Sequence, residues 1–163
     1  MTATEDPWRL QELGIGCYLC PPRLTESLGT LLIAQLSVSG LYLVKDQRFR
    51  GLSTLILNEH VTQLDALAAD AYSAYLRDLR VSVRAVRATV NPDHMNVELL
   101  GNSCPHLHWS IAPRYRSDPR WGRPIWDDSM RHEMRHNPAV LPEKQYAEIT
   151  AGIRTALRAI ANR

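Results

Sequence analysis

Apolar and polar residues alternate along the chain in blocks that predict both strands and helices. Five apolar or alternating runs have the length of strands and are bounded by polar, glycine-containing or proline-containing segments: 31–37, 41–45, 52–57, 95–100 and 106–112. Only short polar segments separate the first three of these runs. We therefore expect the first three strands to pair as an antiparallel meander.

The helical signal is strongest in the middle of the chain. Apolar residues recur at three- and four-residue intervals from Leu64 to Val86, which is the period of an amphipathic helix. This helix is expected to begin between Thr62 and Asp65 and to end before Asn91-Pro92, because proline disfavours helix in the residue before it. A closing helix is expected at 143–161, after an irregular loop at 114–128. The pattern predicts an α+β fold: an antiparallel sheet of about five strands, one long helix and a C-terminal helix.

Length and composition indicate one folded domain. The chain has 163 residues, of which 45% are hydrophobic and 22% are charged, and these values are typical of a globular protein. A net charge of +2 gives no case for a partner that is a nucleic-acid polymer or a membrane surface. The charge is uneven, however, since arginines cluster between Arg114 and Arg135. A local anion site therefore stays open.

The remaining compositional features predict a cytoplasmic protein. No run approaches the roughly 18 apolar residues of a membrane-spanning helix, and the polar N-terminus does not have the pattern of a secretory signal. Three cysteines are too few for a disulfide scaffold in a chain of this length. Cys17 and Cys20 form a C-x-x-C pair, which is typical of a reducing compartment, and Cys104 stands alone as an expected small packed residue.

Two histidines in the last predicted strand are the main candidates for chemistry. Because side chains alternate along a strand, His106, His108 and Ser110 are expected on one face and Leu107, Trp109 and Ile111 on the core face. The preceding turn at 101–103 is rich in hydrogen-bond donors. This arrangement suits a phosphate held against a nucleophilic histidine. Two half-buried histidines with only a structural role would give the same pattern.

This stretch resembles the histidine triad (HIT) superfamily of nucleotide hydrolases and transferases. The motif of that family is H-φ-H-φ-H-φ-φ, with φ apolar, and it stands here as His106-Leu-His108-Trp-Ser110-Ile-Ala. The flanks at 96–102 and 113–126 match as well, and 46–64 is similar to the family's central hairpin leading into its long helix. The resemblance covers roughly residues 17–126 and is closest to bacterial members described as diadenosine-polyphosphate-hydrolase-like. It implies a single HIT-like domain over 1–163, with 127–163 as a C-terminal extension, and a homodimer.

The resemblance also implies roles for individual residues. His108 matches the family nucleophile, which attacks the α-phosphorus of a nucleotide or dinucleoside polyphosphate and forms a nucleotidyl-histidine intermediate. Asn96, Asn102 and Ser103 match positions that bind or position the phosphate, and Asp46 is a weaker match to a residue that binds the ribose hydroxyls. The implied activity is hydrolysis or nucleotidyl transfer.

Ser110 departs from the family pattern, because a histidine or, in transferases, a glutamine usually stands there. Serine is shorter and is a poor proton donor at neutral pH. The change is compatible with an altered enzyme or with a nucleotide-binding, regulatory module that has a degenerate triad. It is also compatible with a specialised biosynthetic enzyme that cleaves or forms a P–O or P–N bond.

A zinc site is a further implication of the resemblance. Cys17 and Cys20, in a knuckle expected to be closed by Pro21-Pro22, supply only half of a tetrahedral site on their own. In zinc-binding family members a histidine opening the long helix and the first triad histidine complete the set, and here these are His60 and His106. Four protein ligands suit a structural zinc. The alternative is that the thiols are free and His60 is a surface residue.

The sequence contains three weaker signals. The segment 132–136 matches the metalloprotease pattern H-E-x-x-H, but Asn137-Pro138 follows at once, and a solvated charged turn is the better interpretation. Trp121 and Trp126 are expected either to gate the substrate or to pack against the C-terminal region. The arginines of the loop are expected either to neutralise a polyphosphate or to form a solvated surface: Arg114, Arg116, Arg120 and Arg123.

Overall fold

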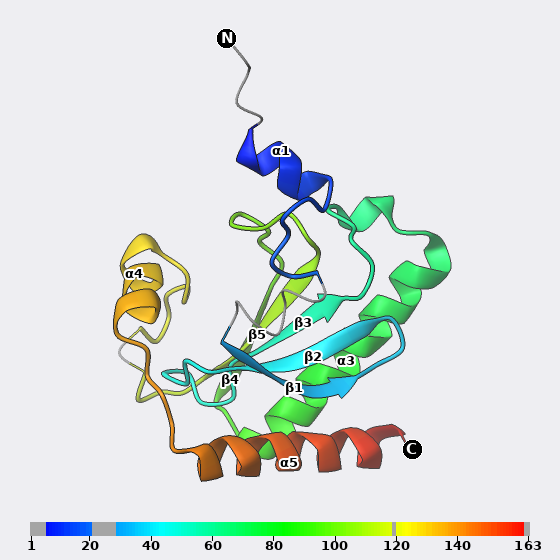
Figure 1. The fold of residues 1–163 in the computed structure, drawn as a ribbon. Coiled ribbons are helices and arrows are strands. Elements are labelled where there is room, and N and C mark those ends of the chain that lie inside the picture. Colours follow the sequence, from blue (N-terminus) through cyan, green and yellow to red (C-terminus); the bar gives the residue numbers. More distant parts are fainter. Residues whose placement is uncertain (1–5, 21–28, 119, 162–163) are drawn as a thin grey trace.

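The computed structural model describes residues 6–20, 29–118 and 120–161. One sheet, two long helices and several short helical segments make up the fold (Figure 1). In chain order the elements are α1 (Pro7–Glu12), β1 (Thr30–Gln35), β2 (Ser39–Val44), β3 (Ser53–Leu57), the 3₁₀ turn η1 (Leu64–Ala66), α3 (Ala69–Val90), β4 (His94–Glu98), β5 (His108–Arg114), α4 (Asp128–His136) and α5 (Glu143–Ala161).

The five strands form a single antiparallel sheet in the order β1-β2-β3-β5-β4. The meander of the first three strands is confirmed, and β5 inserts between β3 and β4. In this register Thr54 lies opposite Ser110 and Ile56 lies opposite His108. Residues that pair directly in an antiparallel sheet share a face, so these four side chains lie on the same side. The predicted α+β class is confirmed.

The core lies between the sheet and the two long helices. Buried residues from three strands, among them Leu41, Leu55 and Ile111, pack in one cluster with Tyr75 of α3 and Ile153 of α5. Leu107 and Trp109 join that cluster, as the alternation predicted. No helix among the described residues is long and apolar enough to cross a membrane.

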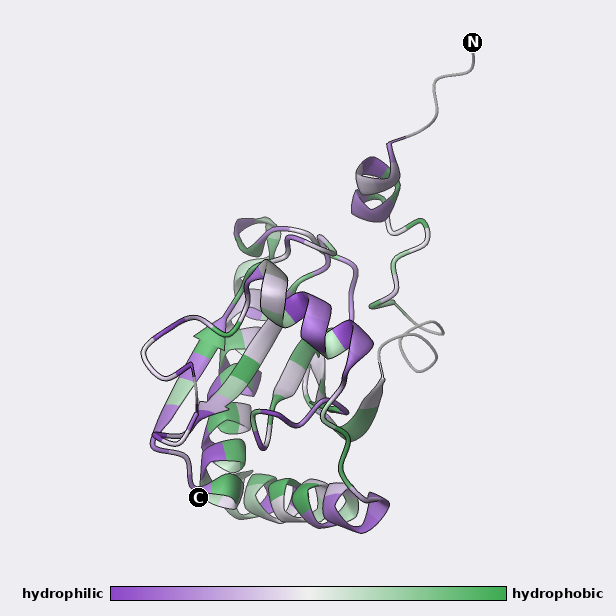
Figure 2. Cartoon of the chain, turned by 90° about the vertical axis from the view of Figure 1, so that its left-hand side faces the viewer, coloured by the Kyte–Doolittle hydropathy of each residue, from purple (hydrophilic) through white to green (hydrophobic). Residues whose placement is uncertain are grey.

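Among the described residues, two segments pack on the opposite face of the sheet, one near each end. The segment around Cys17 and Leu19 packs against Tyr42 and Ile56 at one end. At the other end α4 packs on the sheet, and Figure 2 shows this helix as mostly hydrophilic. A functional site can therefore form between the two covers, where the described residues enclose a cavity.

Two helical predictions need correction. The long helix begins at Ala69 rather than at 62–65, because Leu67 and Ala68 are extended and only the short η1 turn precedes them. Residues 7–12, which carried no helical prediction, form α1, with Asp6 accepting a hydrogen bond from the Trp8 amide as its cap. Both helix starts depend on local capping and backbone conformation, to which the hydrophobic period is insensitive.

The segment 132–136 belongs to a helix and not to the charged turn that the sequence predicted. Asp127 caps α4 by accepting a hydrogen bond from the Met130 amide at 2.8 Å. Met130 and Met134, one helical turn apart, pack on the buried cluster that contains Phe49 and Ile125. These contacts stabilise a helix of only nine residues, which is too short to be stable alone.

A buried carboxylate joins α3 to the turn between β1 and β2. Asp78 is 5% exposed and accepts hydrogen bonds from both the amide and the hydroxyl of Ser37, from the Val38 amide and from the Ser39 hydroxyl. We expect Asp78→Ala to lower the free energy of unfolding by about 3 kcal/mol, because buried donors lose their acceptor. Urea unfolding measures this, with Glu148→Ala on the exposed face of α5 as the control. Equal urea midpoints for Asp78→Ala and Glu148→Ala would contradict a stabilising role of the Asp78 hydrogen bonds.

Candidate functional site

His108 is the first residue of β5, and its side chain lies on the accessible face of the sheet. Its Nδ1 is 2.7 Å from the backbone carbonyl oxygen of His106. A carbonyl oxygen can only accept, so Nδ1 carries the proton and Nε2 keeps its lone pair. Burial lowers the pKa of His108, which favours the neutral ring. The arrangement therefore prepares Nε2 to act as a nucleophile.

A cavity of about 270 Å³ lies beside this histidine, near the lower end of the size range of ligand sites. Its walls come from the central strands, from the segment at 100–103 before β5, from the N-terminal segment and from α4. The polar lining residues include Asn102, Ser103, Ser110 and Thr54, while Trp126 and Met134 contribute apolar surface. Trp126 thus lines the cavity, whereas Trp121 lies elsewhere and is 41% exposed. The cavity therefore combines an apolar wall with neutral hydrogen-bond donors.

The structure brings some of the predicted site residues together and leaves two apart. His108, Ser110, Asn102 and Ser103 all line the cavity beside the nucleophile. Asn96 lies in β4 and lines a separate cavity with Arg114 and Trp121. Asp46 lines neither of these cavities.

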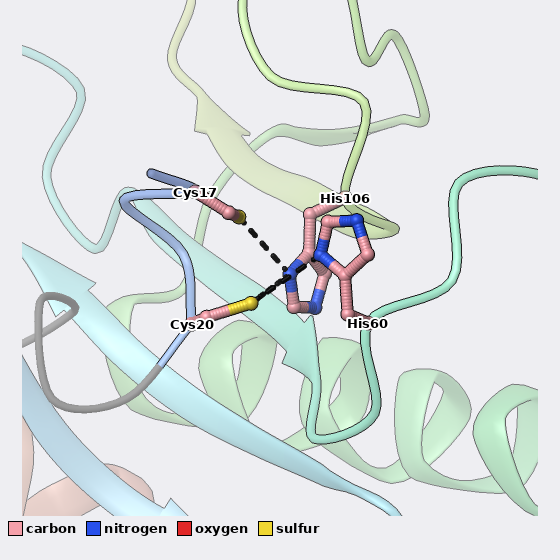
Figure 3. A group of neighbouring side chains, drawn as sticks. All are labelled: Cys17, Cys20, His60 and His106. Atoms are coloured by element: carbon pink, nitrogen blue, oxygen red, sulfur yellow. Dashed lines mark hydrogen bonds between the residues drawn. The ribbon is translucent and has the colours of Figure 1, made fainter. Parts of the chain in front are cut away.

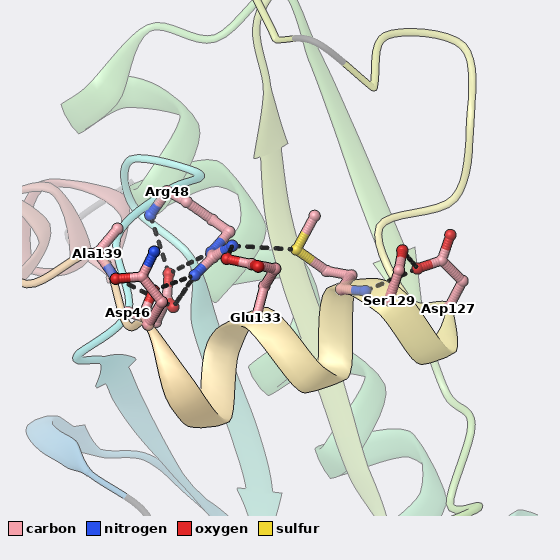
Figure 4. A network of polar contacts seen from close by, with 8 residues as sticks. Asp46, Arg48, Asp127, Ser129, Glu133 and Ala139 are labelled. Atoms are coloured by element: carbon pink, nitrogen blue, oxygen red, sulfur yellow. Dashed lines mark hydrogen bonds and ion pairs between the residues drawn. The ribbon is translucent and has the colours of Figure 1, made fainter.

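Asp46 is 6% exposed and forms a clamp with Arg48 (Figure 4). The guanidinium of Arg48 donates three hydrogen bonds to the Asp46 carboxylate, at 2.9 to 3.1 Å. The same guanidinium donates to the Asn137 carbonyl at 2.8 Å and contacts Met130 Sδ at 3.6 Å. The clamp therefore connects the turn after β2 to both ends of the segment that contains α4.

The arginines of the loop after β5 are mostly engaged with carboxylates. Arg114 is 3% exposed, with its Nε 2.7 Å from the Asp118 carboxylate, and it donates to two backbone carbonyls of the loop. Arg116 pairs with Asp93, and Arg120 pairs with the helix cap Asp127. Arg114 is thus neither a polyphosphate ligand nor a solvated residue, because its charge organises the loop.

Two other arginines, which sequence reasoning did not select, line the cavity. Arg131 and Arg135 project from α4, and Arg131 Nη1 donates to Ser103 Oγ at 3.2 Å. Their spacing of four residues, which repeats that of Met130 and Met134, is the available signal in the sequence. This spacing places the two arginines on one side of a helix only if the segment is helical, which the sequence did not predict.

A second cluster lies where the N-terminal segment meets the start of β5 (Figure 3). Cys17, Cys20, His60 and His106 bring one ligand atom each to a group whose atoms all lie within 4.8 Å of one another. Cys20 Sγ is 3.3 Å from His60 Nδ1 and 3.4 Å from His106 Nδ1, and Cys17 Sγ is 3.5 Å from His106 Nδ1. Tetrahedral zinc with ordinary bond lengths places sulfur and nitrogen ligands about 3.5 Å apart, so the spacing fits that ion.

The hydrogen bonds of the two imidazoles support the same ligand set. His106 Nε2 is 2.8 Å from the Leu57 carbonyl oxygen, and His60 Nε2 is 3.1 Å from the Glu12 carbonyl oxygen. Both Nε2 atoms must therefore donate, which leaves the Nδ1 lone pairs directed to the sulfurs. Such bonds from the second ring nitrogen orient most metal-binding histidines in proteins.

Three predictions about this cluster can be compared with the structure. His106 precedes β5 instead of lying within it, and His60 precedes η1 instead of opening the long helix. The prolines expected to close the knuckle lie outside the described residues. Cys104 is fully buried and packed 3.6 Å from Cys17, outside the ligand group, as expected.

The H-E-x-x-H segment lies on α4, but its surroundings do not suit catalysis. His132 and His136 are exposed, with ring centroids 4.3 Å apart, and Glu133 lies 4.0 Å from the Arg48 guanidinium. Within the described ranges the only group of three or more potential metal ligands is the one at Cys17 and Cys20. The motif thus has the helix that a metalloprotease needs but no third ligand.

Comparison with known proteins identifies solved structures that share the fold of this chain. No family model matches the sequence, and no curated protein matches it. A histidine triad protein of Bradyrhizobium japonicum has a TM-score of 0.71 at 22% identity, over 83% of this chain and 95% of that one. One of Marinobacter aquaeolei has a TM-score of 0.72 at 20% identity, over 86% and 97%. A zinc-bound histidine triad family protein of Mycobacterium smegmatis has a TM-score of 0.57 at 16% identity, over 82% and 87%. At these identities the likeness establishes the fold.

Proposed function

We propose that this chain, which has the histidine triad fold, is a nucleotide hydrolase or nucleotidyl transferase acting at the α-phosphate of a nucleotide or dinucleoside polyphosphate. The observation that carries the proposal is the hydrogen bond from His108 Nδ1 to the His106 carbonyl oxygen beside the cavity. It supports a neutral imidazole with a free lone pair next to neutral donors for a phosphate. Solved structures with the same fold include histidine triad proteins of several bacteria.

In the proposed reaction, His108 Nε2 attacks the α-phosphorus and a nitrogen–phosphorus bond forms. The bond from phosphorus to the leaving oxygen breaks, and that oxygen keeps the electron pair. The His106 carbonyl oxygen stabilises the positive charge that develops on the ring. Asn102 and Ser103 donate to the phosphoryl oxygens. Water then attacks the nucleotidyl-histidine in a hydrolase, and a second substrate attacks it in a transferase.

The proposal is tested by intact mass spectrometry after incubation with a panel of nucleoside polyphosphates, dinucleoside polyphosphates and phosphoramidates. We expect an added mass of one nucleoside monophosphoryl group, together with product in the same samples. The mass identifies the nucleotide. Nucleotide binding without adduct or product would contradict catalysis and would favour the alternative, a binding module in which Ser110 has replaced a proton donor.

We further propose that Cys17, Cys20, His60 and His106 hold a structural zinc ion. The ligand spacing and the orientation of both imidazoles support it, and a zinc-bound protein of the same fold is known. The ion, when bound, would join the N-terminal segment to the start of β5 without an open coordination position.

Two predictions from the sequence, the homodimer and the cytoplasmic location, stay predictions. The homodimer is tested by light scattering after size-exclusion chromatography, for which twice the 18.5 kDa chain mass is expected. The cytoplasmic location is tested by cell fractionation. The roles of Asn96 and Asp46 in substrate binding likewise remain proposals, to be tested with bound nucleotide.

A further inference from the structure

The charged side chains that line the cavity beside His108 are positive. Arg131 and Arg135 line it, and none of the described residues in its lining is Asp or Glu. Within the part of the chain that the structure describes, neither arginine forms an ion pair, whereas Arg114, Arg116 and Arg120 each pair with a carboxylate. Two positive charges therefore face the cavity with no counterion from the described residues, which favours an anionic occupant.

Contacts along α4 hold the helix that carries these two guanidinium groups. The Asp127 cap fixes the start of α4, and Met130 and Met134 bury its inner face. Arg48 donates to the Asn137 carbonyl and so secures the end of the helix. Arg131 also donates to Ser103, one of the proposed phosphate-binding residues. The arginine pair is thus held opposite the strand that carries His108 and Ser110.

We propose that Arg131 and Arg135 form a subsite for an anionic leaving group. This subsite would stabilise the leaving group in place of the histidine or glutamine that usually stands at the position of Ser110. The inference rests on the proposed function. A leaving phosphate or polyphosphate departs as an anion with the electron pair of the broken phosphorus–oxygen bond, so it needs charge stabilisation but no proton. Guanidinium groups supply that charge and do not titrate. An amine leaving group needs a proton, which serine supplies poorly at neutral pH.

The binding test uses inorganic pyrophosphate and the full chain in isothermal titration calorimetry. We expect Arg135→Gln and Arg131→Gln each to weaken pyrophosphate binding about tenfold, equivalent to about 1.4 kcal/mol. Arg158→Gln, which removes the same charge from α5, is expected to change nothing. Unchanged affinity in both α4 variants would overturn the subsite. Arg131→Gln removes the hydrogen bond to Ser103 and could loosen α4. Arg135 is exposed, so Arg135→Gln leaves the helix folded and tests the subsite independently.

The leaving-group test compares a nucleoside triphosphate with a nucleoside phosphoramidate. We expect the double variant Arg131→Gln/Arg135→Gln to lose about 100-fold in kcat/KM for the triphosphate and little for the phosphoramidate. An equal loss for both substrates would overturn the leaving-group role. The calorimetric result separates the two proposals. If the protein turns over neither substrate, the proposed activity fails, while weaker pyrophosphate binding by the variants still establishes the subsite and unchanged binding still removes it.

Discussion

Replacing His108 with alanine is expected to lower kcat by at least about 10⁴-fold, because it removes the nucleophile of a covalent mechanism. The loss should fall on kcat more than on substrate affinity, since Asn102, Ser103 and the walls of the cavity remain. Single-turnover kinetics with the nucleotide identified by mass spectrometry measures it. The adduct should disappear from the intact-mass spectrum of the same variant.

The matched control is His94→Ala, which removes an exposed imidazole from β4, at the far edge of the sheet. We expect it to retain the activity and the adduct. Turnover by His108→Ala at the rate of the unaltered protein would refute the covalent mechanism. A variant that keeps the product but loses the adduct would indicate direct attack by water.

Removing the metal or one of its ligands is expected to have the largest effect on stability. The four ligands come from three separate parts of the sequence, around residues 17–20, 60 and 106, so the ion would connect segments that are distant along the chain. Burial raises the pKa of Cys20 to about 12 and lowers that of His106 to about 4, so without a metal these two groups are neutral and attract each other only weakly. We expect Cys20→Ser to lower the free energy of unfolding by about 3–5 kcal/mol.

Thermal unfolding with and without a chelator, together with metal analysis of the purified protein, measures this effect. The chelator should destabilise the unaltered protein and leave Cys20→Ser unchanged. Cys104→Ala is the control, because this buried cysteine lies beside the cluster but outside the ligand group. Protein that carries no stoichiometric zinc, and is indifferent to the chelator, would exclude the metal site.

Much of the architecture could be predicted because the strands and α5 have clear periodic patterns. Helix α5 spans Glu143–Ala161, as the sequence indicated, and the core face at Leu107, Trp109 and Ile111 follows from simple alternation. The same alternation predicts that His106 and His108 share one environment. In the structure the ring of His106 belongs to the cysteine cluster, while His108 lines the cavity. Period alone cannot distinguish these environments, which depend on the distant N-terminal segment.

The parts that sequence reasoning missed depend on contacts between distant segments. Helix α4 contains only two apolar residues in a mostly polar sequence, and a local pattern does not reveal their packing against the buried cluster of Phe49. The burial of Arg114 and the clamp on Asp46 have the same origin. Charged residues in a polar stretch were therefore assigned to solvent or ligand when their partners were other parts of the chain.

His106 makes two contacts whose combination matters for the cell. Its ring belongs to the proposed zinc site, and its carbonyl oxygen sets the tautomer of His108. Loss of the ion would release the N-terminal segment, whose Tyr18 and Leu19 line the cavity beside His108, and would remove one of the contacts that hold His106 in place. If the proposed function holds, zinc starvation would therefore weaken nucleotide binding and turnover together, and the supply of the ion would set the amount of competent protein.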